Sequence, residues 1–148
     1  MTSKTMTTKK TISRTWKTLL SASALSAVLG TAQAATLLVG SYTEGTASEG
    51  IYRYQFDTAK GRIEPTPLQV VKTVSPSWLV LSADQRQLFA VNETPQGHAS
   101  SFSISSNGEI KPLNQVVTQG DEPTHASLSR DQRYLFVANY AVNPDPGG

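Results

Sequence analysis

An internal repeat restricts the fold of this chain more than any other feature of its sequence. Residues 76–92 and 123–139 align without a gap, and nine of these 17 positions carry the same residue. The same offset of 47 residues relates Gly61, Ile63 and Pro65 to Gly108, Ile110 and Pro112. Periods of roughly 40–50 residues with strands and turns inside are typical of β-propeller blades, which are four-stranded antiparallel sheets around a central channel. The repeat therefore predicts an all-β propeller.

The strands of this propeller can be placed on the sequence. Short runs rich in β-branched and aromatic residues alternate with Gly, Pro, Asn, Asp and Ser, as expected for strands and turns. One complete blade is predicted at 77–82, 87–92, 100–105 and 114–118. The last three strands of an earlier blade are predicted at 36–41, 50–57 and 68–74, and the first two of a later blade at 125–129 and 134–139. Asn107-Gly108 is a strong hairpin signal because both residues tolerate positive φ.

These nine strands amount to little more than two blades, whereas closed propellers have ~4–8. We therefore expect residues 35–148 to be the N-terminal part of a longer propeller domain that has seven blades in the full-length protein. The alternative is a small open sheet of nine strands, which would leave apolar blade faces and two sheet edges uncovered. For the same reason we expect the truncated chain to fold poorly by itself.

Residues 1–34 have the pattern of a secretory signal peptide. They contain five basic residues and no acidic residue, then an apolar stretch, and they end in Ala32-Gln33-Ala34. This order of basic region, short apolar region and small-x-small site predicts cleavage after Ala34 and a periplasmic or secreted protein. The alternative is a transmembrane anchor, but the apolar run of about 11 residues is shorter than the ~20 that a span requires. After cleavage we expect no stable membrane association.

Charge and cysteine content exclude several functions. The chain has 13 Lys and Arg against 11 Asp and Glu, and five of the 13 lie in the predicted signal peptide, which leaves 8 against 11, a net charge of −3. The remaining domain has no basic cluster for a phosphate backbone, so no nucleic acid partner is predicted. The absence of cysteine excludes disulfides, thiolate metal sites and a Cys nucleophile. No G-x-S-x-G, P-loop, G-x-G-x-x-G or H-E-x-x-H motif is present.

Candidate catalytic residues lie among the loops at one end of the predicted blades. His125 takes the place that Trp78 holds one repeat earlier, at the expected start of an innermost strand. A histidine there can act as a general base near neutral pH, or it can merely cap the preceding turn. Glu93 is a second, weaker candidate for acid–base chemistry, and its alternative is an exposed loop carboxylate. Asp84 and Asp131 recur in equivalent turns, where we expect them to accept bonds from backbone N–H groups.

Two stretches of the sequence resemble a known family. Residues 39–43 (VGSYT) followed by 50–57 (GIYRYQFD), together with 123–125 (PTH) and 129–140 (SRDQRYLFVANY), are similar to the lactonase family of seven-bladed propellers. This family includes propeller-type 6-phosphogluconolactonases and fungal carboxymuconate lactonizing enzymes. The resemblance implies a hydrolase that opens a sugar lactone, or a relative that closes one, with a small-molecule substrate and no metal or organic cofactor. His125 is the matching residue that could take part in catalysis, with Glu93 as the weaker candidate.

The export signal and the acidic loops make an unphosphorylated lactone the expected substrate. A phosphorylated sugar is normally a cytoplasmic substrate, and Lys72, at the end of a predicted outer strand, is the nearest basic residue to the acidic loop end of the predicted blades. Any further cation for a phosphate group would have to come from the missing blades. The alternative function is a non-catalytic propeller that binds a protein or a saccharide in the cell envelope.

Overall fold

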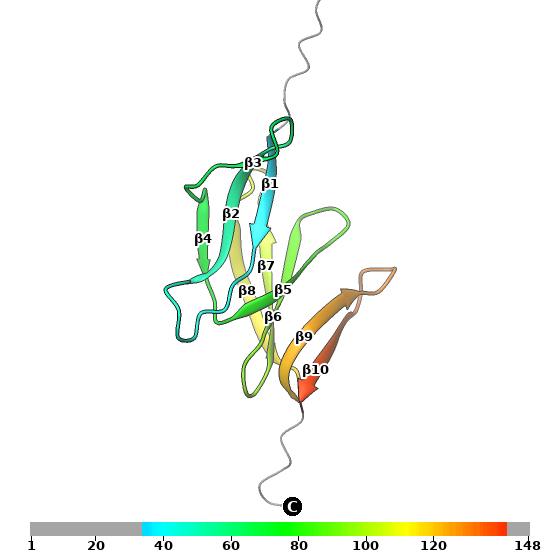
Figure 1. Ribbon diagram of the computed structural model, residues 1–148. Coiled ribbons are helices and arrows are strands. Elements are labelled where there is room, and N and C mark those ends of the chain that lie inside the picture. The colour runs from blue at the N-terminus through cyan, green and yellow to red at the C-terminus, as the bar shows by residue number, and fades with distance from the viewer. Residues whose placement is uncertain (1–33, 142–148) are drawn as a thin grey trace, which may run out of the picture. The chain divides into compact units, whose positions relative to one another are not determined.

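The computed structural model describes residues 34–141, which form ten β-strands and no helix (Figure 1). The strands are β1 (Ala34–Val39), β2 (Gly50–Asp57), β3 (Arg62–Ile63), β4 (Gln69–Lys72), β5 (Pro76–Leu81), β6 (Gln87–Asn92), β7 (His98–Ile104), β8 (Ile110–Val117), β9 (Asp121–Leu128) and β10 (Leu135–Ala141). A helix long and apolar enough to cross a membrane is not found in this part of the chain. The predicted signal peptide lies outside the described residues, apart from Ala34.

The predicted complete blade is present as a four-stranded antiparallel sheet with the order β5-β6-β7-β8. We call it the second blade. The first blade consists of β1, β2 and β4, with the two-residue β3 also paired to β2. The third blade consists of β9 and β10. The predicted all-β fold and strand order are therefore confirmed, and β3 is the strand that the sequence pattern did not indicate.

Apolar residues of the first and second blades form the main core. Ile51 and Val71 of the first blade pack with buried side chains of the second blade: Leu88, Ala90, Phe102 and Ile110. Burying one large aliphatic or aromatic side chain is worth about 1.5–3 kcal/mol. Packing between neighbouring sheets, rather than a disulfide, therefore holds the blades together.

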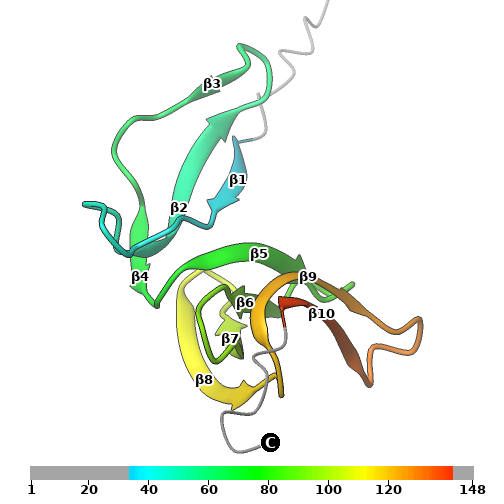
Figure 2. The same ribbon diagram turned by 60° about the horizontal axis from the view of Figure 1, so that its bottom comes forward.

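The first strands of the second and third blades lie side by side (Figure 2). Trp78 on β5 donates from Nε1 to the carbonyl oxygen of Ala126 on β9, at 2.9 Å. This bond links the inner strands of successive blades, and it brings equivalent parts of the two repeats next to each other.

The repeated Asp residues organise the turns that follow the inner strands. Asp84 Oδ1 accepts hydrogen bonds from the Ser82 hydroxyl at 2.6 Å and from the backbone N–H of Arg86 at 3.1 Å. Asp131 makes the same two kinds of bond in the third blade. The serine hydroxyl, followed by the backbone N–H, lowers the pKa of both carboxyl groups because these bonds favour the ionised form. The prediction that these Asp residues bond to the backbone of their turns is confirmed.

Candidate active site

Four connections gather at one end of the blades, and we call them the mouth loops: 40–49, 73–75, 93–97 and 118–120. Ser75 joins the first two loops, because its backbone N–H donates to Thr43 Oγ1 at 3.0 Å and its hydroxyl accepts from the Thr43 N–H at 3.3 Å. Its carbonyl oxygen also accepts the N–H of Glu93 at 3.0 Å. Ser75 is buried and has a φ of 39°. One residue therefore connects three strand ends.

A similar arrangement recurs one repeat later. Glu122, the residue equivalent to Ser75, has a φ of 50° and donates its N–H to the carbonyl oxygen of Thr94 at 3.0 Å. The neighbouring Asp121 accepts the N–H of Gln96 at Oδ1, at 2.8 Å. Asp121 is buried, and this bond gives its carboxylate a structural partner. No group of three or more His, Cys, Asp or Glu that could hold a metal ion occurs between residues 34 and 141.

Asn92, at the end of β6, bonds the mouth loop 73–75 to the second blade. Its Nδ2 donates to Thr73 Oγ1 at 3.0 Å and to the carbonyl oxygen of Val74 at 2.5 Å. Its Oδ1 accepts from Ser100 Oγ at 2.6 Å and from Gln115 Nε2 at 3.2 Å. Asn92 is only 1% exposed, and both polar atoms of its side chain are hydrogen-bonded. The sequence did hold a signal for this role, because an asparagine recurs at the equivalent position of the next repeat, Asn139. The sequence analysis did not assign a role to either residue.

His125 lies on β9, opposite Ala138 of β10, and its side chain is exposed. Because β9 begins at Asp121, His125 sits within the strand and not at its start, which corrects the predicted boundary. The imidazole packs against the indole of Trp78, with ring centroids 4.5 Å apart and planes inclined by 50°. Since Trp78 is itself bonded to β9, this contact restrains the ring of the histidine while leaving it accessible.

Glu93 directly follows β6 and is half-buried. Its carboxylate accepts a hydrogen bond from the Tyr42 hydroxyl of the first mouth loop, and this bond raises the pKa of the Tyr42 phenol. Burial and the negative charges of Glu93 and Glu122 act in the same direction. Sequence reasoning missed Tyr42, although it lies in the VGSYT stretch. Among the described residues, no hydrogen bond or ion pair joins Glu93 to His125, so Glu93 pairs with Tyr42 and His125 with Trp78.

Lys72 at the end of β4 is engaged by an acidic neighbour. Its Nζ lies 2.7 Å from a carboxylate oxygen of Glu49. The hydrogen bond to Glu49 and the charge of that carboxylate raise the pKa of Lys72, which therefore stays cationic. The mouth loops otherwise carry the carboxylates of Glu44, Glu93 and, at the start of β9, Asp121 and Glu122.

Comparison with known proteins agrees with this architecture. The model of the family "Lactonase, 7-bladed beta-propeller" matches residues 36–144. Among solved structures, a periplasmic gluconolactonase of Pseudomonas aeruginosa is similar, with 48% identity and a TM-score of 0.68 over 74% of this chain and 32% of that one. A candidate 6-phosphogluconolactonase of Bacteroides fragilis has 32% identity and a TM-score of 0.65, over 73% of this chain and 30% of that one.

A corresponding Bacteroides uniformis protein has the same identity and TM-score as the B. fragilis protein and covers 73% of this chain and 31% of that one. The search of curated proteins gives no match. The chain thus spans about a third of the length of these structures. The family match covers most of the chain, including every described blade and the mouth loops. The chain belongs to the lactonase family of seven-bladed β-propellers.

Proposed function

We propose that the protein containing this chain hydrolyses a sugar lactone and works in the periplasm or outside the cell. The observation that carries the proposal is the 48% identity to a structure described as a periplasmic gluconolactonase, over 74% of this chain. The family match and the signal-like residues 1–34 support the same conclusion. The mouth loops and the exposed face of β5 and β9 would supply part of the active site.

Lactone hydrolysis needs an activated water and a proton for the leaving oxygen. The water oxygen bonds to the carbonyl carbon, the bond between that carbon and the ring oxygen breaks, and the ring oxygen takes up a proton to become a hydroxyl. The acid formed then loses a proton to solvent. We assign His125 as the group that takes the proton from water and returns it to the ring oxygen. Its accessible imidazole, restrained by Trp78, suits this role.

Glu93 is proposed as a second acid–base or orienting group at the mouth. Its carboxylate already accepts the Tyr42 hydroxyl. A substrate hydroxyl could bond to the same carboxylate, because an ionised carboxylate has more than one acceptor site. The Tyr42–Glu93 pair would then hold the polar side of a sugar ring.

The preferred substrate is an unphosphorylated lactone. A phosphate group is usually recognised by Arg or Lys through charge-assisted hydrogen bonds. The basic residue nearest the mouth, Lys72, is paired with Glu49, and the other mouth charges described above are carboxylates. These charges disfavour a dianionic phosphate near the first three blades.

The competing function is a propeller that binds a saccharide without cleaving it. It is favoured by the aromatic side chains of Tyr42, Trp78 and Tyr140, which are 55%, 42% and 79% exposed. Exposed aromatic rings can stack on apolar faces of sugars. A binder of this kind would show ligand affinity without any lactone loss.

The test is an assay of the whole protein on glucono-1,5-lactone and on its 6-phosphate. We expect lactone loss well above the spontaneous rate, with the unphosphorylated lactone preferred. His125→Gln should lower kcat by roughly 10²–10⁴-fold, the usual contribution of a general acid–base group. His98→Gln, the other histidine of the chain, serves as the control and should leave kcat nearly unchanged.

The two parts of the proposal fail in different ways. Wild-type protein that consumes neither lactone faster than buffer would refute the hydrolase and favour the saccharide binder. An active wild type with an equally active His125→Gln variant would remove the role of His125 and leave the hydrolase standing.

A further inference from the structure

The backbone that leads to Trp78 is unusual. Ser75 has a φ of 39°, although it precedes Pro76, and a residue before proline normally adopts an extended conformation. The pairing of β5 with β6 then shifts between Pro76 and Trp78, which leaves Ser77 as the extra residue of a β-bulge. Bulges redirect nearby side chains and are frequent beside active sites. The direction of the Trp78 side chain is therefore set by this turn and bulge, and not by strand alternation alone.

The same backbone leads to His125 one repeat later. Glu122 has a φ of 50° and precedes Pro123. The pairing of β9 with β10 leaves Thr124 as the extra residue between Pro123 and His125. Equivalent segments of neighbouring inner strands thus present the rings of Trp78 and His125 near the mouth loops. Since His125 is the proposed acid–base group, the repeat places Trp78 at the corresponding position of the adjacent blade.

The indole of Trp78 is fixed, and part of it is left open. Its Nε1 donates to the carbonyl oxygen of Ala126 at 2.9 Å, and its ring centroid lies 4.5 Å from that of His125. Both contacts are made with β9, so the 42% of Trp78 that stays exposed is surface that β9 does not cover. Nε1 is the only polar atom of an indole. The exposed part of the ring is therefore an apolar surface beside the imidazole.

This apolar surface is connected to the polar pair of the mouth through Ser75. The Ser75 N–H donates to Thr43 Oγ1 at 3.0 Å, and its carbonyl oxygen accepts the N–H of Glu93 at 3.0 Å. Tyr42, which precedes Thr43, bonds to the Glu93 carboxylate. Trp78 follows Ser75 by three residues. A sugar ring has hydroxyl groups at its rim and C–H groups on its faces, so it needs both kinds of surface.

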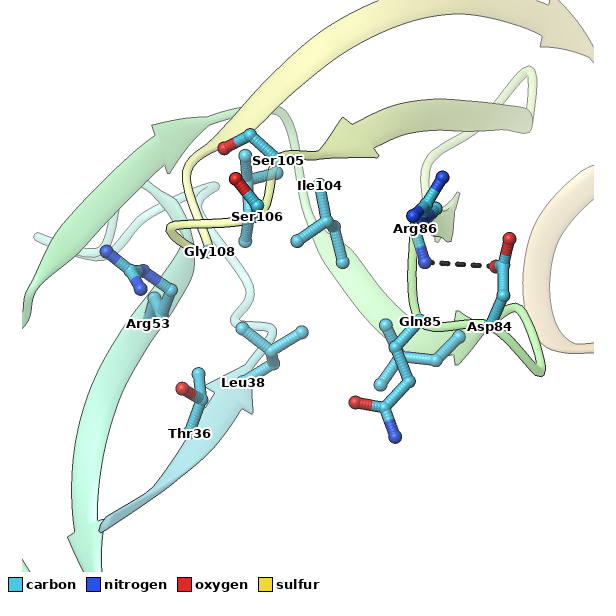
Figure 3. Close-up of a pocket in the computed structure, with 12 residues that line it drawn as sticks. Thr36, Leu38, Arg53, Asp84, Gln85, Arg86, Ile104, Ser105, Ser106 and Gly108 are labelled. Atoms are coloured by element: carbon cyan, nitrogen blue, oxygen red, sulfur yellow. Dashed lines mark hydrogen bonds between the residues drawn. The ribbon is translucent and has the colours of Figure 1, made fainter.

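The hollow at the opposite end of the blades lacks this chemistry. It has a volume of about 620 Å³, and its lining includes Asp84, Arg53 and Arg86 beside aliphatic and hydroxyl side chains (Figure 3). None of the residues that line it is aromatic or a histidine. A sugar ring in that hollow would have neither an indole to lie on nor an imidazole for proton transfer.

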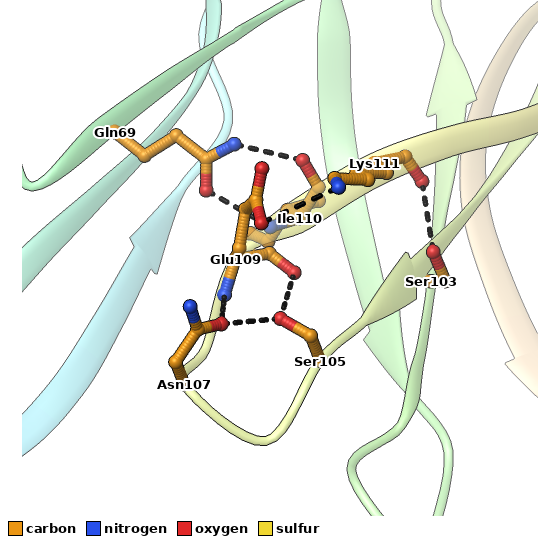
Figure 4. Close-up of polar contacts among 7 residues, drawn as sticks. All are labelled: Gln69, Ser103, Ser105, Asn107, Glu109, Ile110 and Lys111. Atoms are coloured by element: carbon orange, nitrogen blue, oxygen red, sulfur yellow. Dashed lines mark hydrogen bonds and ion pairs between the residues drawn. The ribbon is translucent and has the colours of Figure 1, made fainter.

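Polar side chains beside that hollow serve the structure of the blades. Gln69 of β4 donates from Nε2 to the carbonyl oxygen of Ile110 at 2.7 Å, and its Oε1 accepts the Ile110 N–H at 2.9 Å (Figure 4). Asn107 Oδ1 accepts the N–H of Glu109 at 3.1 Å, and the Glu109 carboxylate lies 3.5 Å from Lys111 Nζ. These contacts join the first two blades and shape the β7–β8 turn, whereas the ring of Trp78 keeps exposed surface for a ligand.

We propose that Trp78 binds the C–H face of the closed lactone ring and so places its carbonyl carbon beside His125. This inference rests on the proposed lactonase function and adds to it a residue that determines specificity. The closed ring offers a flat face of C–H groups to the indole. The open-chain acid that hydrolysis produces has no fixed flat face and loses more conformational freedom on binding. Trp78 therefore favours the substrate over the product.

The first test compares two neutral probes on the whole protein: glucono-1,5-lactam, which has a closed ring, and gluconamide, which is an open chain. Dissociation constants and contact surfaces are measured by saturation-transfer NMR. We expect the lactam to bind roughly tenfold more tightly than gluconamide, with the strongest transfer to its ring C–H protons. Equal affinities, or transfer that does not favour the ring C–H protons, would overturn the proposal.

The second test uses matched variants. Trp78→Leu should raise the dissociation constant of the lactam roughly tenfold, because the flat apolar contact is lost, and should raise KM for glucono-1,5-lactone in parallel. The affinity for gluconamide should change by less than about twofold. Trp78→Phe keeps a flat ring but not the Nε1 bond, and it should retain most of the lactam affinity. Tyr134→Leu, which removes a 58% exposed ring at the opposite end of the blades, is the control and should bind the lactam like wild type.

The outcomes separate Trp78 from the hydrolase. Unchanged lactam affinity in Trp78→Leu, equal losses in Trp78→Leu and Trp78→Phe, or an equal loss in Tyr134→Leu overturns the role of Trp78. If Trp78→Leu does not fold, the comparison of the two probes on wild-type protein decides. Lactam binding that depends on Trp78, in a protein that consumes no glucono-1,5-lactone, would refute the hydrolase and keep the stacking surface.

Discussion

At the scale of single residues, Tyr42 and Glu93 belong to different blades and meet at the mouth. The hydrogen bond to Glu93 raises the pKa of the Tyr42 phenol above its ordinary value. A raised pKa means that the folded state favours the protonated phenol. The stability from this bond is therefore present at neutral pH and is lost as the pH rises through the folded-state pKa, above about 10.

The Tyr42–Glu93 contact can be tested by titration. Glu93→Gln removes the charged acceptor, so the pKa of Tyr42 should fall toward that of a free tyrosine. The measurement is an NMR pH titration with ¹³Cζ-labelled tyrosine, in which Tyr42 is assigned through Tyr42→Phe. Glu64→Gln, which changes an exposed glutamate away from the mouth loops, is the control and should leave Tyr42 unaffected. An unchanged pKa in Glu93→Gln contradicts the contact.

Residue-scale predictions from the sequence succeeded where the repeat carried the information. The turn role of Asp84 was predicted because the same residue recurs at Asp131, and the structure confirms it. The catalytic role of His125 stays a prediction, since no contact tests it. Tyr42 could not be predicted as the partner of Glu93, because 51 residues separate them and no pattern links a loop tyrosine to a distant carboxylate.

At the scale of elements, Asn92 at the end of β6 bonds to the loop between β4 and β5 and to side chains of β7 and β8, through the four hydrogen bonds described above. Asn92→Ala would leave several buried groups without partners, so it should lower the free energy of unfolding by roughly 3 kcal/mol. Asn114→Ala makes the same chemical change on the exposed face of β8 and should have a small effect. Denaturant unfolding of the whole protein measures both. Equal effects of the two substitutions would show that the network around Asn92 adds nothing.

The strands were predictable to within a few residues because alternation and turn residues mark them. The largest errors are the starts of two strands: β8 begins at Ile110 and not at 114, and β9 begins at Asp121 and not at 125. In β9 the reason is clear. The sequence DEPT contains two acidic residues and a proline, which are poor strand formers. Tertiary pairing overrides this preference, since Asp121 lies opposite Ala141 and Pro123 opposite Asn139. The two-residue β3 was missed because it is too short to show any period.

At the scale of the whole molecule, the repeat predicted blades but not the contacts between them. Ile110 belongs to the repeat, but Gln69 does not, and the 41 residues between them do not match the period of 47, so their double hydrogen bond had no sequence signal. The 47-residue period identifies the blade as the repeating unit. The surfaces between blades depend on side chains that differ from one blade to the next.

The exposed face of the third blade leads to the last prediction. Phe136 is 60% exposed, whereas its equivalent one repeat earlier, Phe89, is half-buried. In a seven-bladed protein, a further blade should cover Phe136 as the first blade covers Phe102, which is 2% exposed.

In the whole protein, Phe136→Ala should then destabilise about as much as Phe102→Ala, by roughly 3–5 kcal/mol. Leu113→Ala on the outer strand β8 is the control, and its effect should be small because Leu113 is 57% exposed. Thermal unfolding of the three variants gives the comparison. If Phe136→Ala behaves like the Leu113 variant, this face stays open to solvent in the whole protein, and the third blade does not pack as the second one does.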